Sequence, residues 1–163
     1  MGKEIENWES RDLEYIWHPA AQMKDYEELP PMVIERAKGV WLYDVHGKKY
    51  LDIISSWWCN LFGHCNPIIN QAVKEQIDRL EHVIFANFSN EPAIRLAEEL
   101  ARIVPKGLAK FHFNDNGSSA VEAGLKMCFQ YHLQTGHPER QKFMCLSEGY
   151  HGETIGALSV GSL

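Results

Sequence analysis

The sequence predicts an α/β fold in which a small antiparallel meander precedes the start of a larger domain built on a parallel sheet. Short alternating apolar runs separated by glycine-containing turns lie between residues 32 and 54, which is typical of hairpin-connected strands. A strand, a helix and a strand then follow each other between residues 110 and 146. This order predicts a βαβ unit with parallel strands and a right-handed crossover.

The composition is that of an ordinary acidic globular protein. The 163 residues are 45% hydrophobic, and 16 basic against 22 acidic residues give a formal net charge of -6. The chain has no run of five or more like charges, so neither nucleic acid nor a membrane surface is expected as a partner. It also has no apolar stretch long enough to span a bilayer, and its N-terminus is too acidic for a signal peptide, so we expect a cytoplasmic protein.

The cysteines do not indicate a metal centre. The four cysteines, at positions 59, 65, 128 and 145, include no Cys-x-x-Cys pair and are expected to be free thiols. Cys59, His64 and Cys65 bring three soft ligands together, but no second cluster completes a four-ligand zinc set. We therefore expect no metal site.

The chain divides into three expected parts. Residues 1–31 lack sustained periodicity and are expected to form an N-terminal arm, in which Trp17-His18-Pro19 packs on this chain or on a partner subunit. Residues 32–65 hold the meander and an aromatic loop, and residues 66–163 form the first, incomplete part of the larger domain. Because a parallel sheet needs covering helices on both faces, the chain is expected to be part of a larger protein.

Three helices are expected after the meander. Residues 66–80 and 90–104 each begin with an asparagine cap and a proline in the first turn, and each continues with apolar residues at helical spacing. The third helix is expected to begin at about Ser118 or Ser119, because Ser119 and Glu122 fit a capping box.

The turn Asn116-Gly117-Ser118 is the strongest local indication of a binding site. Free backbone N–H groups, hydroxyls and the positive end of a helix dipole all favour an anion at the start of a helix. A plain helix cap is about equally expected from the turn alone, and the pattern is neither a P-loop nor Gly-x-Gly-x-x-Gly.

Aromatic residues provide two further candidates. Tyr150 follows the predicted strand 141–146, where it would either stack on a planar ring or anchor a surface loop. Trp57 and Trp58 follow the last run of the meander, where they would form either a packing plug or one wall of a pocket.

Together these motifs resemble the N-terminal part of class III pyridoxal-phosphate aminotransferases, from about residue 15 to residue 162. The resemblance is carried by Trp17-His18-Pro19, Ser55-Ser56-Trp57-Trp58, Asn114-Asp115-Asn116-Gly117-Ser118 with Val121-Glu122, Gln141-Lys142-Phe143 and Gly149-Tyr150-His151-Gly152-x-Thr154. It implies the fold of type I pyridoxal-phosphate-dependent transferases, with pyridoxal 5'-phosphate as cofactor.

The resemblance also implies roles for particular residues. Gly117 and Ser118 match the turn that binds the cofactor phosphate. Tyr150 matches the aromatic residue that stacks on the pyridine ring beside the substrate, and Trp57 matches a tryptophan that walls the substrate pocket. His151 matches a supporting position. No residue matches the Schiff-base lysine, so no catalytic residue is expected in this chain, and the 163 residues alone are expected to be inactive.

The paired tryptophans and Gly-Tyr-His-Gly are most similar to the branch that aminates 8-amino-7-oxononanoate to 7,8-diaminononanoate in biotin biosynthesis. Ala20 stands where the users of adenosylmethionine have a tyrosine, so adenosylmethionine and lysine both remain open as amino donors. Asn116 and Glu153 replace the usual serine and aspartate. The alternatives are another class III omega-amino-acid transaminase and a stand-alone, non-catalytic interaction module. Exposed strand edges and apolar faces predict a homodimer or another form of self-association.

Overall fold

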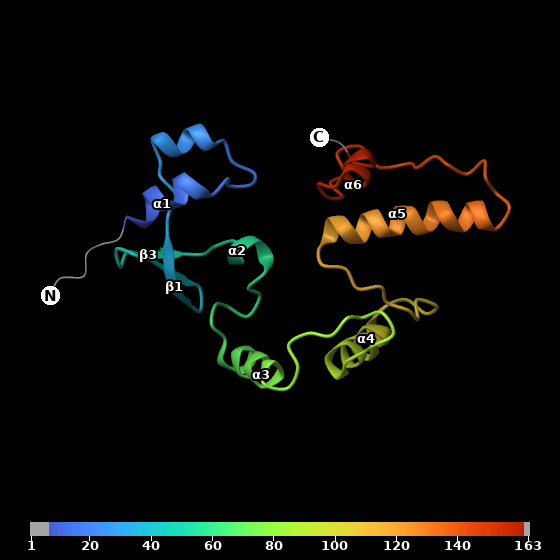
Figure 1. The fold of residues 1–163 in the computed structure, drawn as a ribbon, viewed down its shortest axis with the longest axis horizontal. Coiled ribbons are helices and arrows are strands. Elements are labelled where there is room, and N and C mark those ends of the chain that lie inside the picture. The colour runs from blue at the N-terminus through green and yellow to red at the C-terminus, as the bar shows by residue number, and fades with distance from the viewer. Residues whose placement is uncertain (1–6, 162–163) are drawn as a thin grey trace. The chain divides into compact units, whose positions relative to one another are not determined.

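The computed structural model describes residues 7–161 (Figure 1). These residues divide into two compact units, with the boundary between Val83 and Ile84. The first unit contains α1 (Trp8–Tyr15), η1 (Met23–Glu27), three strands, α2 (Ser55–Trp58) and α3 (Pro67–Ile77). The second contains α4 (Glu91–Ile103), α5 (Gly117–Gln134) and α6 (Ile155–Ser159). Among the described residues, no helix combines the length and the apolar character needed to cross a membrane.

The predicted meander is confirmed. Strands β1 (Ile34–Lys38), β2 (Trp41–Asp44) and β3 (Lys49–Leu51) form an antiparallel sheet in the order β1-β2-β3. Gly39 and Gly47 lie in the two turns with φ of 60° and 81°, a conformation that glycine adopts without steric cost. The segment that carries Trp57 and Trp58 follows β3 directly and is thereby attached to this sheet.

The carboxylate of Asp44, at the end of β2, organises the turn between β2 and β3. It accepts hydrogen bonds from the backbone N–H groups of His46 (3.0 Å) and Lys48 (2.8 Å) and from the Tyr50 hydroxyl (2.7 Å). Asp44 is buried, so these bonds replace the water that its carboxylate loses.

The N-terminal region contains helical structure that the sequence did not predict. The side chain of Asn7 accepts a hydrogen bond from the Ser10 backbone N–H (3.0 Å) and caps α1. His18 contacts Asp12 (2.6 Å) and the ring of Tyr26, whereas Trp17 remains exposed. Of the Trp17-His18-Pro19 motif, His18 therefore makes the packing contact that was expected of the whole motif.

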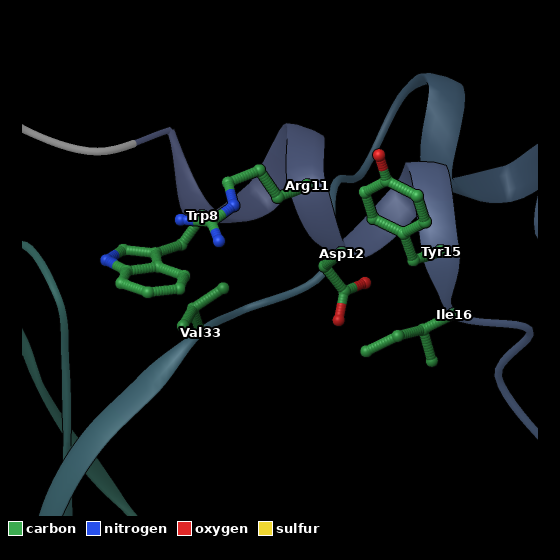
Figure 2. Close-up of a pocket in the computed structure, with 6 residues that line it drawn as sticks. All are labelled: Trp8, Arg11, Asp12, Tyr15, Ile16 and Val33. Atoms are coloured by element: carbon green, nitrogen blue, oxygen red, sulfur yellow. The ribbon is translucent and has the colours of Figure 1, made fainter.

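A pocket beside α1 shows how this helix lies against the chain leading into the sheet. Figure 2 shows the side chains that line it: Trp8, Arg11, Asp12, Tyr15, Ile16 and Val33. The Arg11 guanidinium lies 4.5 Å from the Trp8 ring centroid, and Glu9 is 2.7 Å from the His46 imidazole in the turn between β2 and β3. The Arg11 contact lies within α1, whereas the contact between Glu9 and His46 attaches the helix to the sheet.

The helices α3 and α4 begin where the sequence predicts. The Asn66 side chain accepts from the backbone N–H of Ile68 (3.0 Å), and the Asn90 side chain accepts from that of Ala93 (3.0 Å). Both caps are local interactions, which explains why the sequence pattern identifies them correctly.

The two strands predicted at residues 110–114 and 141–146 are not formed. In the part of the chain that the structure describes, the one sheet is β1-β2-β3. A strand needs a neighbouring backbone to complete its ladder of hydrogen bonds. Neither segment has such a neighbour among residues 7–161, so the predicted parallel pairing is absent here.

The helices leave much of their apolar surface exposed. Among the described residues, Ala157 is the only buried hydrophobic residue. Most of the apolar positions of α3 and α4 that the sequence predicts to face a core are exposed, among them Ile69, Val73, Ile77 and Ile94. These faces remain available for contacts with other protein surface.

Candidate functional site

The start of α5 presents unused hydrogen-bond donors. Asn116 is the N-cap, and its side chain accepts from the Ser119 backbone N–H (2.8 Å), while its carbonyl accepts from that of Ala120 (3.1 Å). The N–H groups of Gly117 and Ser118 have no acceptor within the helix, as geometry requires for its first turn. Two donors therefore remain at the positive end of an 18-residue helix.

The helix start differs from the predicted one. The capping box between Ser119 and Glu122 is not formed, because Asn116 already satisfies the Ser119 N–H and Glu122 bonds elsewhere. The helix consequently begins at Gly117, within the motif that the sequence singles out as an anion site.

Ser118 connects this helix start to the loop of residues 149–154. The Glu153 backbone N–H donates to the Ser118 hydroxyl oxygen (3.0 Å) over a separation of 35 residues. Among residues 7–161 no acceptor is recorded for the Ser118 hydroxyl proton, and a hydroxyl that accepts through its lone pairs can still donate once. Tyr150 lies on this loop with its side chain 70% exposed. The structure thus joins two motifs, Gly117-Ser118 and Tyr150, that the sequence identifies separately.

Gly152 makes this close approach possible. Its φ is 132°, a region that residues with a Cβ rarely adopt. A Cβ at this position would lie 2.7 Å from the Cα of Ser118, far inside van der Waals contact. A glycine is therefore required where the 149–154 loop crosses the start of α5.

Glu122 holds the following segment one turn further along α5. Its Oε2 accepts from the Thr154 hydroxyl (2.7 Å) and from the Ala157 backbone N–H (3.0 Å). The Thr154 bond is the main cause that lowers the pKa of Glu122; burial opposes it, and the backbone N–H groups of Ala157 and Gly156 support it. Since Ser118 and Glu122 are four residues apart, both anchors lie on one face of the helix.

This arrangement can bind a phosphate-sized anion. The donors are the N–H groups of Gly117 and Ser118 and the Ser118 hydroxyl, and together with the helix dipole they favour negative charge. A Cβ on Gly117 would meet no atom within 4 Å, so the space beside the first turn is open. The donor set and this space fit the phosphate of the cofactor that the sequence resemblance implies.

Trp57 belongs to the first unit, on α2, which is an unusual turn. Ser55, Ser56, Trp57 and Trp58 have φ of 50°, 47°, 61° and 66°, so the turn is left-handed. Each non-glycine residue in this conformation costs roughly 1–2 kcal/mol. The side chains of Trp57 and Trp58 are 63% and 79% exposed, so within the described residues they do not form the packing plug that was one reading of the sequence.

The carboxylate of Asp52, whose side chain is 5% exposed, contacts this turn. Asp52 Oδ1 accepts from the Ser56 backbone N–H (3.0 Å), and Oδ2 accepts from the Ser56 hydroxyl (2.7 Å). His64 Nε2 lies 2.8 Å from Oδ2 and acts as the donor, since an ionised carboxylate can only accept. We call Asp52, Ser56 and His64 the Asp52 cluster. Sequence reasoning considered His64 only as a metal ligand and missed its carboxylate partner 12 residues away.

The Asp52 cluster predicts a pH dependence. The Ser56 backbone N–H, followed by His64 and the Ser56 hydroxyl, lowers the pKa of Asp52 from 3.8 to about 2. Because the pKa is depressed in the folded state, the stabilisation is fully present above pH 3.8 and is lost as the pH falls through about 2. Carbon-13 NMR of the Asp52 carboxyl should show a midpoint near 2, and Ser56→Ala should raise it. A midpoint near 4 in the unchanged protein would contradict the cluster.

Comparison with known proteins places the chain among aminotransferases. The model of the family "Aminotransferase class-III" matches residues 22–163. The adenosylmethionine-8-amino-7-oxononanoate aminotransferase of Geobacter sulfurreducens is 46% identical over 98% of this chain and 34% of that protein. The enzyme of the same name from Helicobacter pylori is 48% identical over 97% of this chain and 36% of that protein. The chain therefore spans about a third of the length of the curated relatives it matches.

Solved structures of aminotransferases are also similar to this chain. A crystal structure of adenosylmethionine-8-amino-7-oxononanoate aminotransferase from Methanocaldococcus jannaschii superposes with a TM-score of 0.90 at 47% identity, over 94% of this chain and 35% of that one. The omega transaminase from Pseudomonas jessenii in complex with PMP superposes with a TM-score of 0.88 at 31% identity, over 95% of this chain and 34% of that one. The chain belongs to the class III aminotransferase family.

Proposed function

We propose that this chain supplies the phosphate-binding and ring-stacking part of a pyridoxal 5'-phosphate site in an enzyme that aminates 8-amino-7-oxononanoate to 7,8-diaminononanoate. The observation that carries the proposal is the Ser118 hydroxyl, which holds the Tyr150 loop by accepting from Glu153 and keeps its own proton free. The identities of 42–48% to enzymes named for this acceptor support this branch of the family.

Each residue has a distinct role in this proposal. The N–H groups of Gly117 and Ser118 and the Ser118 hydroxyl donate to the cofactor phosphate. The ring of Tyr150 stacks on the pyridine ring, and Trp57 forms a wall of the substrate pocket. When bound, pyridoxal phosphate supplies the electron sink through which an amino group passes from donor to acceptor. The residues of this chain bind and orient; none is assigned a proton-transfer step.

The same proposal covers the organisation of the chain. Residues 1–31 act as an arm, residues 32–65 as the meander and aromatic loop of a small domain, and residues 66–163 as the first part of the cofactor-binding domain. The exposed apolar residues of α3 and α4 favour self-association, for which a homodimer is the simplest form. We place the protein in the cytoplasm.

An assay of the intact protein tests the function. We expect pyridoxal-phosphate-dependent amination of 8-amino-7-oxononanoate, with adenosylmethionine and lysine compared as donors because of Ala20. Trp57→Ala should raise the KM for the acceptor about tenfold, the usual effect of losing one apolar wall of a pocket. The 163 residues alone should be inactive.

Other outcomes would favour the alternatives. Turnover of simple omega-amino acids without turnover of 8-amino-7-oxononanoate would place the protein with the omega transaminases, which it also matches structurally. Absence of any transamination by the intact protein would favour a non-catalytic interaction module and contradict the proposal.

A further inference from the structure

We infer that Asp52 is a positioning residue for the substrate pocket, because it fixes the left-handed turn that presents Trp57 and Trp58. This inference rests on the proposed role of Trp57 as a pocket wall. It adds that the placement of Trp57 depends on the Asp52 carboxylate.

The turn does not hold its conformation by burial. All four of its residues have positive φ, and both tryptophan rings are exposed. Its backbone hydrogen bonds include one from the Trp58 N–H to the Ile54 carbonyl (2.9 Å) and two to the Ser55 carbonyl, from the N–H groups of Cys59 and Asn60 (3.1 Å for Asn60). None of these three donors belongs to Ser56 or Trp57. A strained segment persists only when surrounding contacts determine its geometry. The side-chain contacts therefore have to supply the remaining constraint.

Asp52 supplies that constraint at Ser56. Its two carboxylate oxygens accept from the Ser56 backbone N–H (3.0 Å) and the Ser56 hydroxyl (2.7 Å), so both the main chain and the side chain of Ser56 are fixed. Charge-assisted hydrogen bonds of this kind are stronger than those between neutral groups. Because Trp57 follows Ser56 directly, its direction is set by the backbone that Asp52 holds.

Asp52 is in turn fixed by the sheet. Its own backbone N–H donates to the carbonyl of Val40, which lies in the turn between β1 and β2 (2.9 Å). His64, which bonds the Asp52 carboxylate, exchanges two backbone hydrogen bonds with Gly39 in that turn (3.0 and 2.8 Å). The side chains of His64 and Asp52 are 14% and 5% exposed. A continuous set of hydrogen bonds thus connects the turn between β1 and β2 to the turn that carries the tryptophans.

A double-mutant cycle in the intact protein tests this role. Asp52→Ala and Trp57→Ala should each raise the KM for the amino acceptor about tenfold, and the affinity for pyridoxal phosphate should stay within about twofold of the parent. If Asp52 acts through Trp57, Asp52→Ala should change KM less than about twofold when Trp57 is already alanine. If Asp52→Ala raises KM by the same factor whether or not Trp57 is alanine, the inference is overturned.

A second pair of variants covers the case in which Asp52→Ala does not fold. Ser56→Ala removes the hydroxyl that bonds Asp52, whereas Ser55→Ala removes a neighbouring hydroxyl in the same conformation for which the structure records no hydrogen bond among the described residues. Ser56→Ala should raise KM for the acceptor severalfold and Ser55→Ala should leave it unchanged. Equal effects would overturn the positioning role.

The outcomes separate this inference from the proposed function. If Trp57→Ala leaves the KM for the acceptor unchanged, the proposed role of Trp57 is wrong, and the positioning role of Asp52 is wrong as well. If Trp57→Ala raises KM while Asp52→Ala and Ser56→Ala do not, the pocket wall stands and only the positioning role of Asp52 is overturned.

Discussion

Replacing Gly152 with alanine should detach the 149–154 loop from the start of α5. The new methyl group would lie 2.7 Å from the Cα of Ser118, and the backbone would have to keep a φ of 132°. Overpacking and a conformation disfavoured for alanine together cost about 2–4 kcal/mol. The free energy of local opening, measured by exchange of the Glu153 amide hydrogen, should fall by this amount, and the affinity for pyridoxal phosphate should fall with it.

Gly124→Ala provides the matched control for this variant. Gly124 lies inside α5, and a Cβ there would meet no atom within 4 Å. The substitution should leave the Glu153 amide protected and should stabilise the helix by about 0.5–1 kcal/mol. If Gly152→Ala and Gly124→Ala give the same exchange rates, the close contact between Gly152 and Ser118 is not present in solution.

Ser118→Ala should weaken binding of pyridoxal phosphate to the intact protein about 10- to 100-fold. The hydroxyl proton is one of the three donors at the start of α5, and a hydrogen bond to a charged group contributes about 1.5–3 kcal/mol. The same substitution removes the acceptor of the Glu153 N–H, so exchange of that amide should accelerate as well. Equilibrium titration of the cofactor and amide exchange measure the two effects separately.

Ser119→Ala separates the role of Ser118 from that of serine hydroxyls in general. Ser119 is the next residue of the same helix, and the structure records no hydrogen bond of its hydroxyl among the described residues. Its replacement should change cofactor affinity less than about twofold. Equal losses in the two variants would contradict the assignment of the phosphate to Gly117 and Ser118.

The sequence predicts those parts of the fold that depend on local interactions. The meander is identified by its glycine turns, and the caps Asn66 and Asn90 bond groups only two or three residues away. The sequence places the start of α5 one or two residues too late, because Ser119 with Glu122 is a good capping pattern and Asn116 is a competing cap. Local patterns do not decide between two adequate caps.

The interactions that build the candidate site are long-range, and the sequence did not reveal them. Glu122 bonds Thr154 over 32 residues, and Asp52 bonds His64 over 12. The left-handed turn at Ser55–Trp58 has no signal in the sequence, because serine and tryptophan do not favour positive φ. For residues 110–114 and 141–146, alternating side chains indicate strands, but a ladder also needs a partner that no side-chain pattern specifies.

The sequence nevertheless identifies the site motifs without showing the contacts between them. The helix-start pattern and the aromatic position indicate Gly117, Ser118 and Tyr150 as candidates, the resemblance to class III aminotransferases gives them roles, and the structure joins their two segments through Ser118, Gly152 and Glu153. The sequence indicates the residues, and the structure adds the physical connection between the helix start and the loop.

A crystal structure of the intact protein with pyridoxal phosphate tests the central claim most directly. We predict that phosphate oxygens lie about 2.7–3.2 Å from the backbone nitrogens of Gly117 and Ser118 and from the Ser118 hydroxyl, with the ring of Tyr150 stacked on the pyridine ring. A cofactor phosphate bound away from the start of α5 would contradict the account.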